Sequence, residues 1–245
     1  AVELTTIPND PLFSYEWGLH NTGQSGWTID TDIDAPEAWN TEIGSNSVVI
    51  AVLDTGIDYT HPDLAQNMWT NPGEIPGNNI DDDNNGYVDD YYGYDFCSYS
   101  PCAVNDSDPI DGYGHGTHVA GTIAAATNNN VGISGVCWNC KLMAVKFFSN
   151  SGSGYVSKAI SGLIYATDNG ADITSNSWKA NNPNVPALEA AFNYARNNGV
   201  VSIASAGNDA SNSKVAPAYY DSVIAVASIT PYGFKSYFSN FGAWV

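Results

Sequence analysis

The stretch SVVIAVL, residues 47–53, is a short apolar run rich in β-branched residues, and it ends at Asp54-Thr55-Gly56. Such a run, bounded by turn residues, predicts a strand buried on both faces, as in a parallel sheet. Beyond it, apolar runs alternate with segments of helical spacing, which is typical of an α/β fold with a parallel sheet and helices on both faces. Further strands are expected at residues 142–148, 173–177, 200–205 and 223–229, and helices at residues 115–126, 155–169 and 187–198.

Two parts of the chain lack this periodicity. The opening residues are rich in turn formers, and residues 71–113 are rich in Asn, Asp, Gly and Tyr without a sustained period. The aromatic residues of this second part need a packing surface, so it is interpreted as a long functional loop region and not as a linker.

The composition limits the classes of protein to which the chain can belong. Its 245 residues fit one large domain or two small ones, and 43% hydrophobic residues suffice for a buried core. Charged residues make up only 13%, which excludes a disordered polyanion. The formal net charge of −19 disfavours binding to nucleic acid, and no apolar run reaches the roughly 18 residues of a membrane span.

The acidic residues are concentrated in the first part of the chain, because residues 1–140 contain no lysine or arginine. Asp is far more abundant than Glu, and Asp suits turns, caps and the ligation of hard cations. Two interpretations remain open: an acidic surface suited to saline surroundings, and local cation sites.

The four cysteines form two close pairs, in CSYSPC and in CWNC. This pattern predicts two local disulfides and an oxidising compartment, with free thiols or a four-thiolate zinc site as alternatives. The cysteines are Cys97, Cys102, Cys137 and Cys140.

No signal peptide is visible and the chain does not begin with Met, so it is interpreted as a mature or excised segment of a secreted, extracellular protein.

Asp54 and Asn208 follow the carboxyl ends of predicted strands, where sites form in parallel sheets, and His115 opens a predicted helix. Asp54 needs a partner if it is buried, and it would either hold a histidine or cap a turn. His115, between two glycines, would be a general base, an incidental residue of a helix start, or one of a metal pair with His118. Asn208, in IASAGND, would donate a hydrogen bond to an oxyanion or be an ordinary turn residue.

Four segments together carry a family resemblance. AVLDTGIDYTHPDL, GHGTHVAGTIAA, SNSW and IASAGND, in that order, closely resemble the subtilisin-like serine proteases, also called subtilases or peptidase family S8. The resemblance implies a three-layer domain in which Asp54 orients His115, His115 acts as general base, and Asn208 is an oxyanion donor. It also implies protein or peptide substrates, an N-terminal propeptide before maturation and a monomer. The substrate-lining positions would be Ser177, Trp178, Ser205, Ala206 and Gly207, while Lys179 stands where the family usually has Gly.

The nucleophile of that family has no counterpart in this sequence. The family carries its Ser in a Gly-Thr-Ser-Met-Ala-type motif downstream of the Asn208 segment, and no such motif occurs here. Residues 1–245 are therefore expected to be one incomplete catalytic domain, inactive by itself. A calcium-stabilised pseudoprotease or binding module is the alternative. An aspartic protease would account for Asp54-Thr55-Gly56, but it would need a second such triplet on an all-β scaffold and would leave His115 without a role.

A structural calcium ion is expected in the segment DDDNNGYVDD, residues 81–90, which places oxygen ligands at alternate positions before a Gly. No Glu follows at the twelfth position, so the segment is not an EF-hand, and a solvated acidic loop is the alternative. The expected ligands are Asp81, Asp83, Asn85, the carbonyl of Tyr87, and Asp89 or Asp90.

The family resemblance implies a second calcium site. Its side-chain ligands would be Asp10, Asp63 and Asn129, although Asn128 competes with Asn129 for this role, and Asn129 could instead be an ordinary turn residue. Carbonyl ligands would come from Val131 and Ile133.

Overall fold

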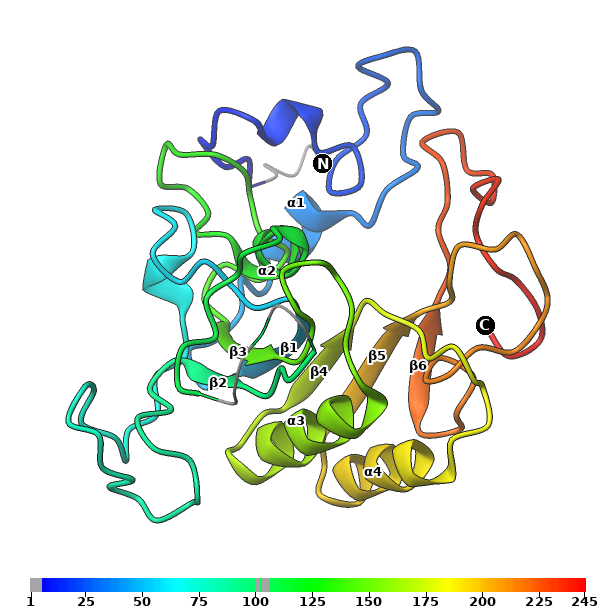
Figure 1. Ribbon diagram of the computed structural model, residues 1–245. Coiled ribbons are helices and arrows are strands. Elements are labelled where there is room, and N and C mark those ends of the chain that lie inside the picture. The colour runs from blue at the N-terminus through cyan, green and yellow to red at the C-terminus, as the bar shows by residue number, and fades with distance from the viewer. Residues whose placement is uncertain (1–5, 100–101, 103–105) are drawn as a thin grey trace.

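The computed structural model describes residues 6–99, 102 and 106–245, and its centre is a six-stranded sheet (Figure 1). All strands are parallel and lie in the order β2-β3-β1-β4-β5-β6, so the first strand of the chain occupies the middle of the sheet. This confirms the predicted α/β class. The strands are β1 (Val49–Asp54), β2 (Gly93–Asp95), β3 (Lys141–Lys146), β4 (Ile173–Asn176), β5 (Val201–Ser205) and β6 (Val223–Val226).

Strand β2 lies inside the segment predicted to be a loop. It has three residues, too few for an alternating pattern to show in the sequence. Its pairing with β3 depends on Gly93, which has a φ of +123° and whose missing Cβ would collide with the carbonyl oxygen of Ala144. The prediction of an unbroken loop at residues 71–113 was therefore wrong for this short stretch.

Helices cover both faces of the sheet, as predicted. In Figure 1, α2 lies above the sheet, and α3 and α4 lie below it. Alternate residues of β1 point to opposite faces of the sheet. Ile50 and Val52 pack in the core under α2, while Ala51 and Leu53 pack in the core with α3 and α4. The helices are α1 (Ala35–Trp39), α2 (His115–Ala124), α3 (Val156–Asp168) and α4 (Pro186–Asn197), with 3₁₀ turns η1 (Phe13–Tyr15) and η2 (Ala65–Asn67).

The cover on the α2 side is uneven. Helix α2 packs against β1 and β3. On the same side of β5 and β6, Val201 is 45% exposed, Ile224 55% and Val226 51%. These three side chains, called here the open face, form an apolar surface on the half of the sheet that lies away from α2.

Both cysteine pairs form disulfides. Cys97 bonds to Cys102 and Cys137 to Cys140, with Cα–Cα distances of 5.8 Å and 5.6 Å. The predicted local pairing is confirmed, and it excludes the zinc and free-thiol alternatives because all four sulfur atoms are bonded. Among the described residues, no helix is long and apolar enough to cross a membrane.

Candidate active site

Asp54 is the last residue of β1 and is fully buried. Its Oδ1 accepts a hydrogen bond from the backbone N–H of Thr55 at 2.7 Å and lies 2.7 Å from Nδ1 of His115. Its Oδ2 has no hydrogen-bond partner within the described part of the chain. Burial raises the pKa of the Asp54 carboxyl, while the bonds from His115 and Thr55 oppose that rise.

His115 begins α2, and Gly116 explains how this helix reaches the end of β1. A Cβ at Gly116 would collide with the carbonyl oxygen of Gly56 and would lie 3.1 Å from Cβ of Asp54. The N–H of Gly116 donates to Oγ1 of Thr55 at 2.9 Å, which ties the helix start to the strand end. The glycine after His115 therefore allows the histidine–carboxylate contact.

Asp111 supports the same helix start, and sequence reasoning missed it. Its carboxylate accepts hydrogen bonds from the backbone N–H groups of Tyr113, Gly114 and Thr117 and from the hydroxyl of Thr117. Burial acts to raise the pKa of Asp111, but these bonds outweigh it and the pKa is lowered. An Asp a few residues before a helix start is a usable signal for such a cap.

His115 and Asn208 line one cavity of about 710 Å³. With Nδ1 of His115 bonded to Asp54, Nε2 is the ring nitrogen left to exchange a proton. Of the predicted substrate-lining residues, Ala206 is buried and does not line the cavity. Those that do are Ser177, Trp178, Ser205 and Gly207, beside aromatic walls from Tyr99, Tyr113, Phe147, Phe148 and Tyr155.

Asn208 lies on a turn directly after β5, where Gly207 has a φ of +98°. The next residue, Asp209, holds Nζ of Lys179 at 2.7 Å and 2.6 Å through its two carboxylate oxygens. Lys179 lines the cavity, so this ion pair stands at its edge. The bond to Lys179 lowers the pKa of the Asp209 carboxyl.

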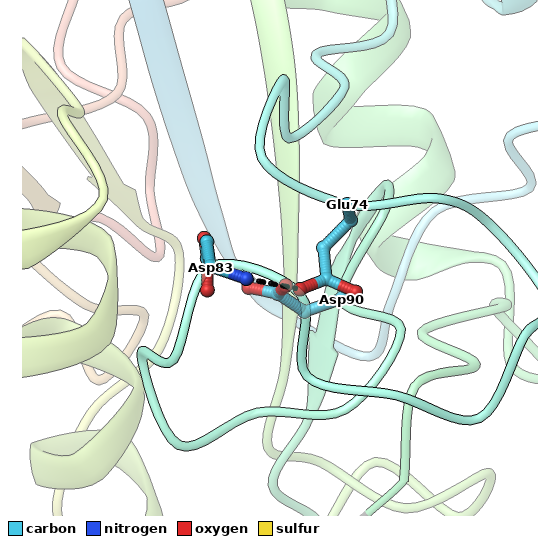
Figure 2. A group of neighbouring side chains, drawn as sticks. All are labelled: Glu74, Asp83 and Asp90. Atoms are coloured by element: carbon cyan, nitrogen blue, oxygen red, sulfur yellow. Dashed lines mark hydrogen bonds between the residues drawn. The ribbon is translucent and has the colours of Figure 1, made fainter.

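A first cation-binding candidate is the cluster of Glu74, Asp83 and Asp90 in the long loop region (Figure 2). One carboxylate oxygen of each lies within 4.8 Å of the others, and no described ion pair involves them. Burial raises the pKa of Glu74 and of Asp90. A set of carboxylate oxygens, two of them from buried residues, fits the hard-cation chemistry of Ca²⁺.

The structure brings only part of the predicted loop ligands into this cluster. Asp83 and Asp90 belong to it, and Asn85 donates from Nδ2 to both. Asp81 instead accepts from the N–H groups of Asn85 and Gly86, and Asp89 from those of residues 77–79. The backbone N–H of Tyr87 donates to Oδ1 of Asn85. Glu74 was missed because it lies outside the alternating Asp pattern.

The second predicted calcium site also gathers in space. Asp63 accepts from Nδ2 of Asn129 and from the N–H of Ile133, while Oδ1 of Asn129 accepts from the N–H of Val131. Asp10 accepts from the N–H of Asn129, and also from the N–H of Asn128 and the hydroxyl of Ser134.

Glu16 was missed at this second site. It accepts from the backbone N–H of Ser134, whose hydroxyl donates to Asp10. Burial first, and then the charges of Asp10 and Asp63, raise its pKa to about 7. The grouping of these acidic residues with amide groups fits an oxygen-ligated cation.

Comparison with known proteins finds relatives along almost the whole chain. A thermophilic serine proteinase from Bacillus sp. (strain AK1) is 39% identical over 239 residues, which are 97% of this chain and 50% of that protein. Thermitase from Thermoactinomyces vulgaris is 39% identical over 238 residues, 97% of this chain and 71% of thermitase. A solved protease structure from Pseudoalteromonas arctica superposes with a TM-score of 0.78 at 32% identity, covering 98% of this chain and 71% of that one.

The chain thus spans half the length of the Bacillus relative and about seven tenths of the other two proteins. The profile of the subtilase family matches residues 45–245, a range that includes Asp54, His115 and Asn208. With this match and with a relative named as a serine proteinase aligned along almost its whole length, the chain belongs to the subtilase family of serine proteases.

Proposed function

We propose that this chain supplies the acid–base and oxyanion parts of a serine endopeptidase that hydrolyses peptide bonds through an acyl-enzyme. The observation that carries the proposal is the 2.7 Å contact between Asp54 and His115 beside the 710 Å³ cavity that Asn208 also lines. A histidine oriented by a buried carboxylate next to a cleft is the arrangement that activates a hydroxyl nucleophile.

Each residue has a defined task in this mechanism. Nε2 of His115 takes the proton of a serine hydroxyl as its oxygen attacks the carbonyl carbon of the substrate, and later gives that proton to the leaving amine. Asp54 keeps the ring in the required tautomer and stabilises the imidazolium. The amide of Asn208 donates to the oxygen that becomes negative in the tetrahedral intermediate. Protein and peptide chains are the proposed substrates.

The serine is proposed to come from a segment outside residues 1–245. No described hydrogen bond joins His115 to a serine hydroxyl. The open face of Val201, Ile224 and Val226 lies on the same sheet as the site and presents apolar area that a further helix would bury. The domain would be completed when such a helix covers this face and brings its serine to the cavity.

Calcium ions are the proposed structural cofactors, held by the Glu74–Asp83–Asp90 cluster and by Asp10 and Asp63 with their neighbours. Secretion is proposed because the two disulfides persist in an oxidising compartment. We further propose that the protein matures from a precursor with an N-terminal propeptide and that it is a monomer.

The test compares residues 1–245 with a chain extended to the natural C-terminus, each treated with a serine-directed fluorophosphonate. Only the extended chain should be labelled and should cleave casein. The matched control, His115→Ala in the extended chain, should lose both labelling and cleavage, because the hydroxyl is then not activated. Labelling of any serine within residues 1–245 would contradict the proposed source of the nucleophile.

A further inference from the structure

Asn240 lies under the turn that carries Asn208, and it comes from a separate part of the chain. It is fully buried, at 0% exposure. A buried side-chain amide costs free energy unless its donors and its acceptor are used, so its bonding partners indicate what the fold requires of it.

All the bonds of this amide go to the turn of residues 206–211. Nδ2 of Asn240 donates to the carbonyl of Ala206 at 2.9 Å. Oδ1 accepts from the N–H of Asp209 at 2.9 Å and from the N–H of Ser211 at 3.1 Å. The backbone N–H of Asn240 adds a bond to the carbonyl of Gly207 at 2.9 Å. These bonds hold both flanks of Asn208 and leave its side chain to the cavity.

The side chain of Asn240 lies so close to the backbone of residue 207 that only glycine fits there. A Cβ there would lie 2.7 Å from Nδ2 of Asn240, which is too close for an unstrained contact. The φ of +98° at Gly207 disfavours other residues for a second reason. The turn and the amide therefore fit each other as a unit.

We propose that Asn240 is a positioning residue that fixes the placement of Asn208 as oxyanion donor. This inference rests on the proposed function. A donor stabilises the transition state only at about 2.7–3.1 Å from the oxyanion, and a displacement of about 1 Å can cost roughly 10²-fold in rate. Asn240 sets that distance by holding the backbone on both sides of the donor.

The test measures kcat and KM in the extended chain, with active sites counted by fluorophosphonate titration so that misfolded protein does not contribute. Asn208→Ala should lower kcat by about 10²–10³. Asn240→Ala should lower kcat by about 10–100-fold with KM changed less than about 3-fold, because the displaced donor acts on charge present only in the transition state. The double variant should be no slower than Asn208→Ala, since Asn240 acts through Asn208.

Two further variants keep the test decisive. Asn240→Asp keeps an acceptor for Asp209 and Ser211 but places a carboxylate oxygen against the carbonyl of Ala206, so kcat per titrated site should fall in this variant too, which gives a second measurement if Asn240→Ala does not fold. The matched control is Asn67→Ala. Asn67 is also buried, but it donates to the carbonyls of Ala124 and Trp138, so kcat per titrated site should not change.

The outcomes separate the two proposals. Wild-type kcat in both Asn240 variants, beside a large loss in Asn208→Ala, would overturn the positioning role alone. Losses that multiply in the double variant would also overturn it, because they would show that Asn240 acts independently of Asn208. Wild-type kcat in Asn208→Ala would instead refute the oxyanion assignment in the proposed function, and the positioning role with it.

Discussion

The Cα atoms of Asp54 and Lys146 are register partners at the ends of the neighbouring strands β1 and β3. Lys146 is buried, and its ammonium donates to the carbonyl of Thr55 and, at 3.1 Å, to Oδ1 of Asn150. Burial lowers the pKa of Lys146, while nearby carboxylates, Asp54 among them, oppose that shift. A buried cation thus holds the turn that follows Asp54.

Replacing Lys146 by Met should destabilise the protein. The carbonyl of Thr55 and Oδ1 of Asn150 would lose their donor, and a buried acceptor left without a hydrogen bond costs about 1–3 kcal/mol in unfolding free energy. Denaturant unfolding of the extended chain measures this cost. The matched control on the same strand is Lys141→Met, whose exposed Nζ donates to the carbonyl of Gln66 and which should change stability little. Equal effects of the two substitutions would contradict the prediction.

Chelation of divalent cations should lower the melting temperature of the extended chain, and added calcium should restore it. A ligand that binds only the native state stabilises it by mass action, by about 2.7 kcal/mol at a concentration of 100 times its Kd. Glu74→Gln and Asp63→Asn should each remove part of the calcium response. Asp82→Asn is the control, because Asp82 lies in the same loop but outside the Glu74 cluster. A full response in Glu74→Gln would show that this cluster holds no ion.

Asp95 should make stability depend on pH between about 4 and 7. Burial raises the pKa of Asp95 to about 7, against the hydrogen bond from Cys97 and the charge of Lys146. The native state therefore binds the proton more tightly than the unfolded chain. Its stabilising contribution is complete below the unfolded pKa near 3.8 and is lost as the pH rises through about 7.

Asp95→Asn cannot ionise, so its unfolding free energy relative to the wild type should rise from pH 4 to pH 8. Oδ1 of the new residue can still accept from Cys97, as Asp95 does. Denaturant titrations of both proteins across this range measure the difference. Parallel curves would show that Asp95 titrates alike in the native and unfolded states.

The Lys179–Asp209 ion pair should keep the edge of the cavity neutral toward substrate side chains. Lys179→Ala should expose the Asp209 carboxylate and raise kcat/KM for peptides with Lys before the scissile bond, relative to Leu, by about 5-fold, the scale of an exposed charge interaction. Added salt should reduce the gain. Lys214→Ala, which removes a cation placed over the ring of Tyr219, is the charge-matched control. An unchanged preference would exclude the pair as a specificity determinant.

The sequence predicted the fold well where the signal is local. The apolar run before Asp54 and the helical spacing of residues 156–168 each identify an element by themselves, because periodicity reflects burial directly. The position of His115 at a helix start, between glycines, followed in the same way. The contact of His115 with Asp54 was anticipated from the strand-end rule and the family resemblance.

The residues that support these elements were not predictable in that way. Glu74 joins an acidic cluster across a gap in the Asp pattern, and Asn240 bonds a turn 31 residues earlier in the sequence. Lys146 continues an apolar run in which one lysine gives no sign that its ammonium is buried. Each depends on long-range packing, which periodicity and motif spacing do not encode.

The strand order has a consequence for how the molecule loosens. From β1 through β4 and β5 to β6, each new strand pairs with the preceding member of this series, so β6 forms an edge. Two of the three open-face residues, Ile224 and Val226, lie on β6, and this edge strand can detach without breaking any pairing of β1, which lies between β3 and β4. Within this series of four strands, backbone amides should therefore exchange with deuterium first in β6 and last in β1, and slow exchange at Leu53 should outlast the loss of protection at Ile224.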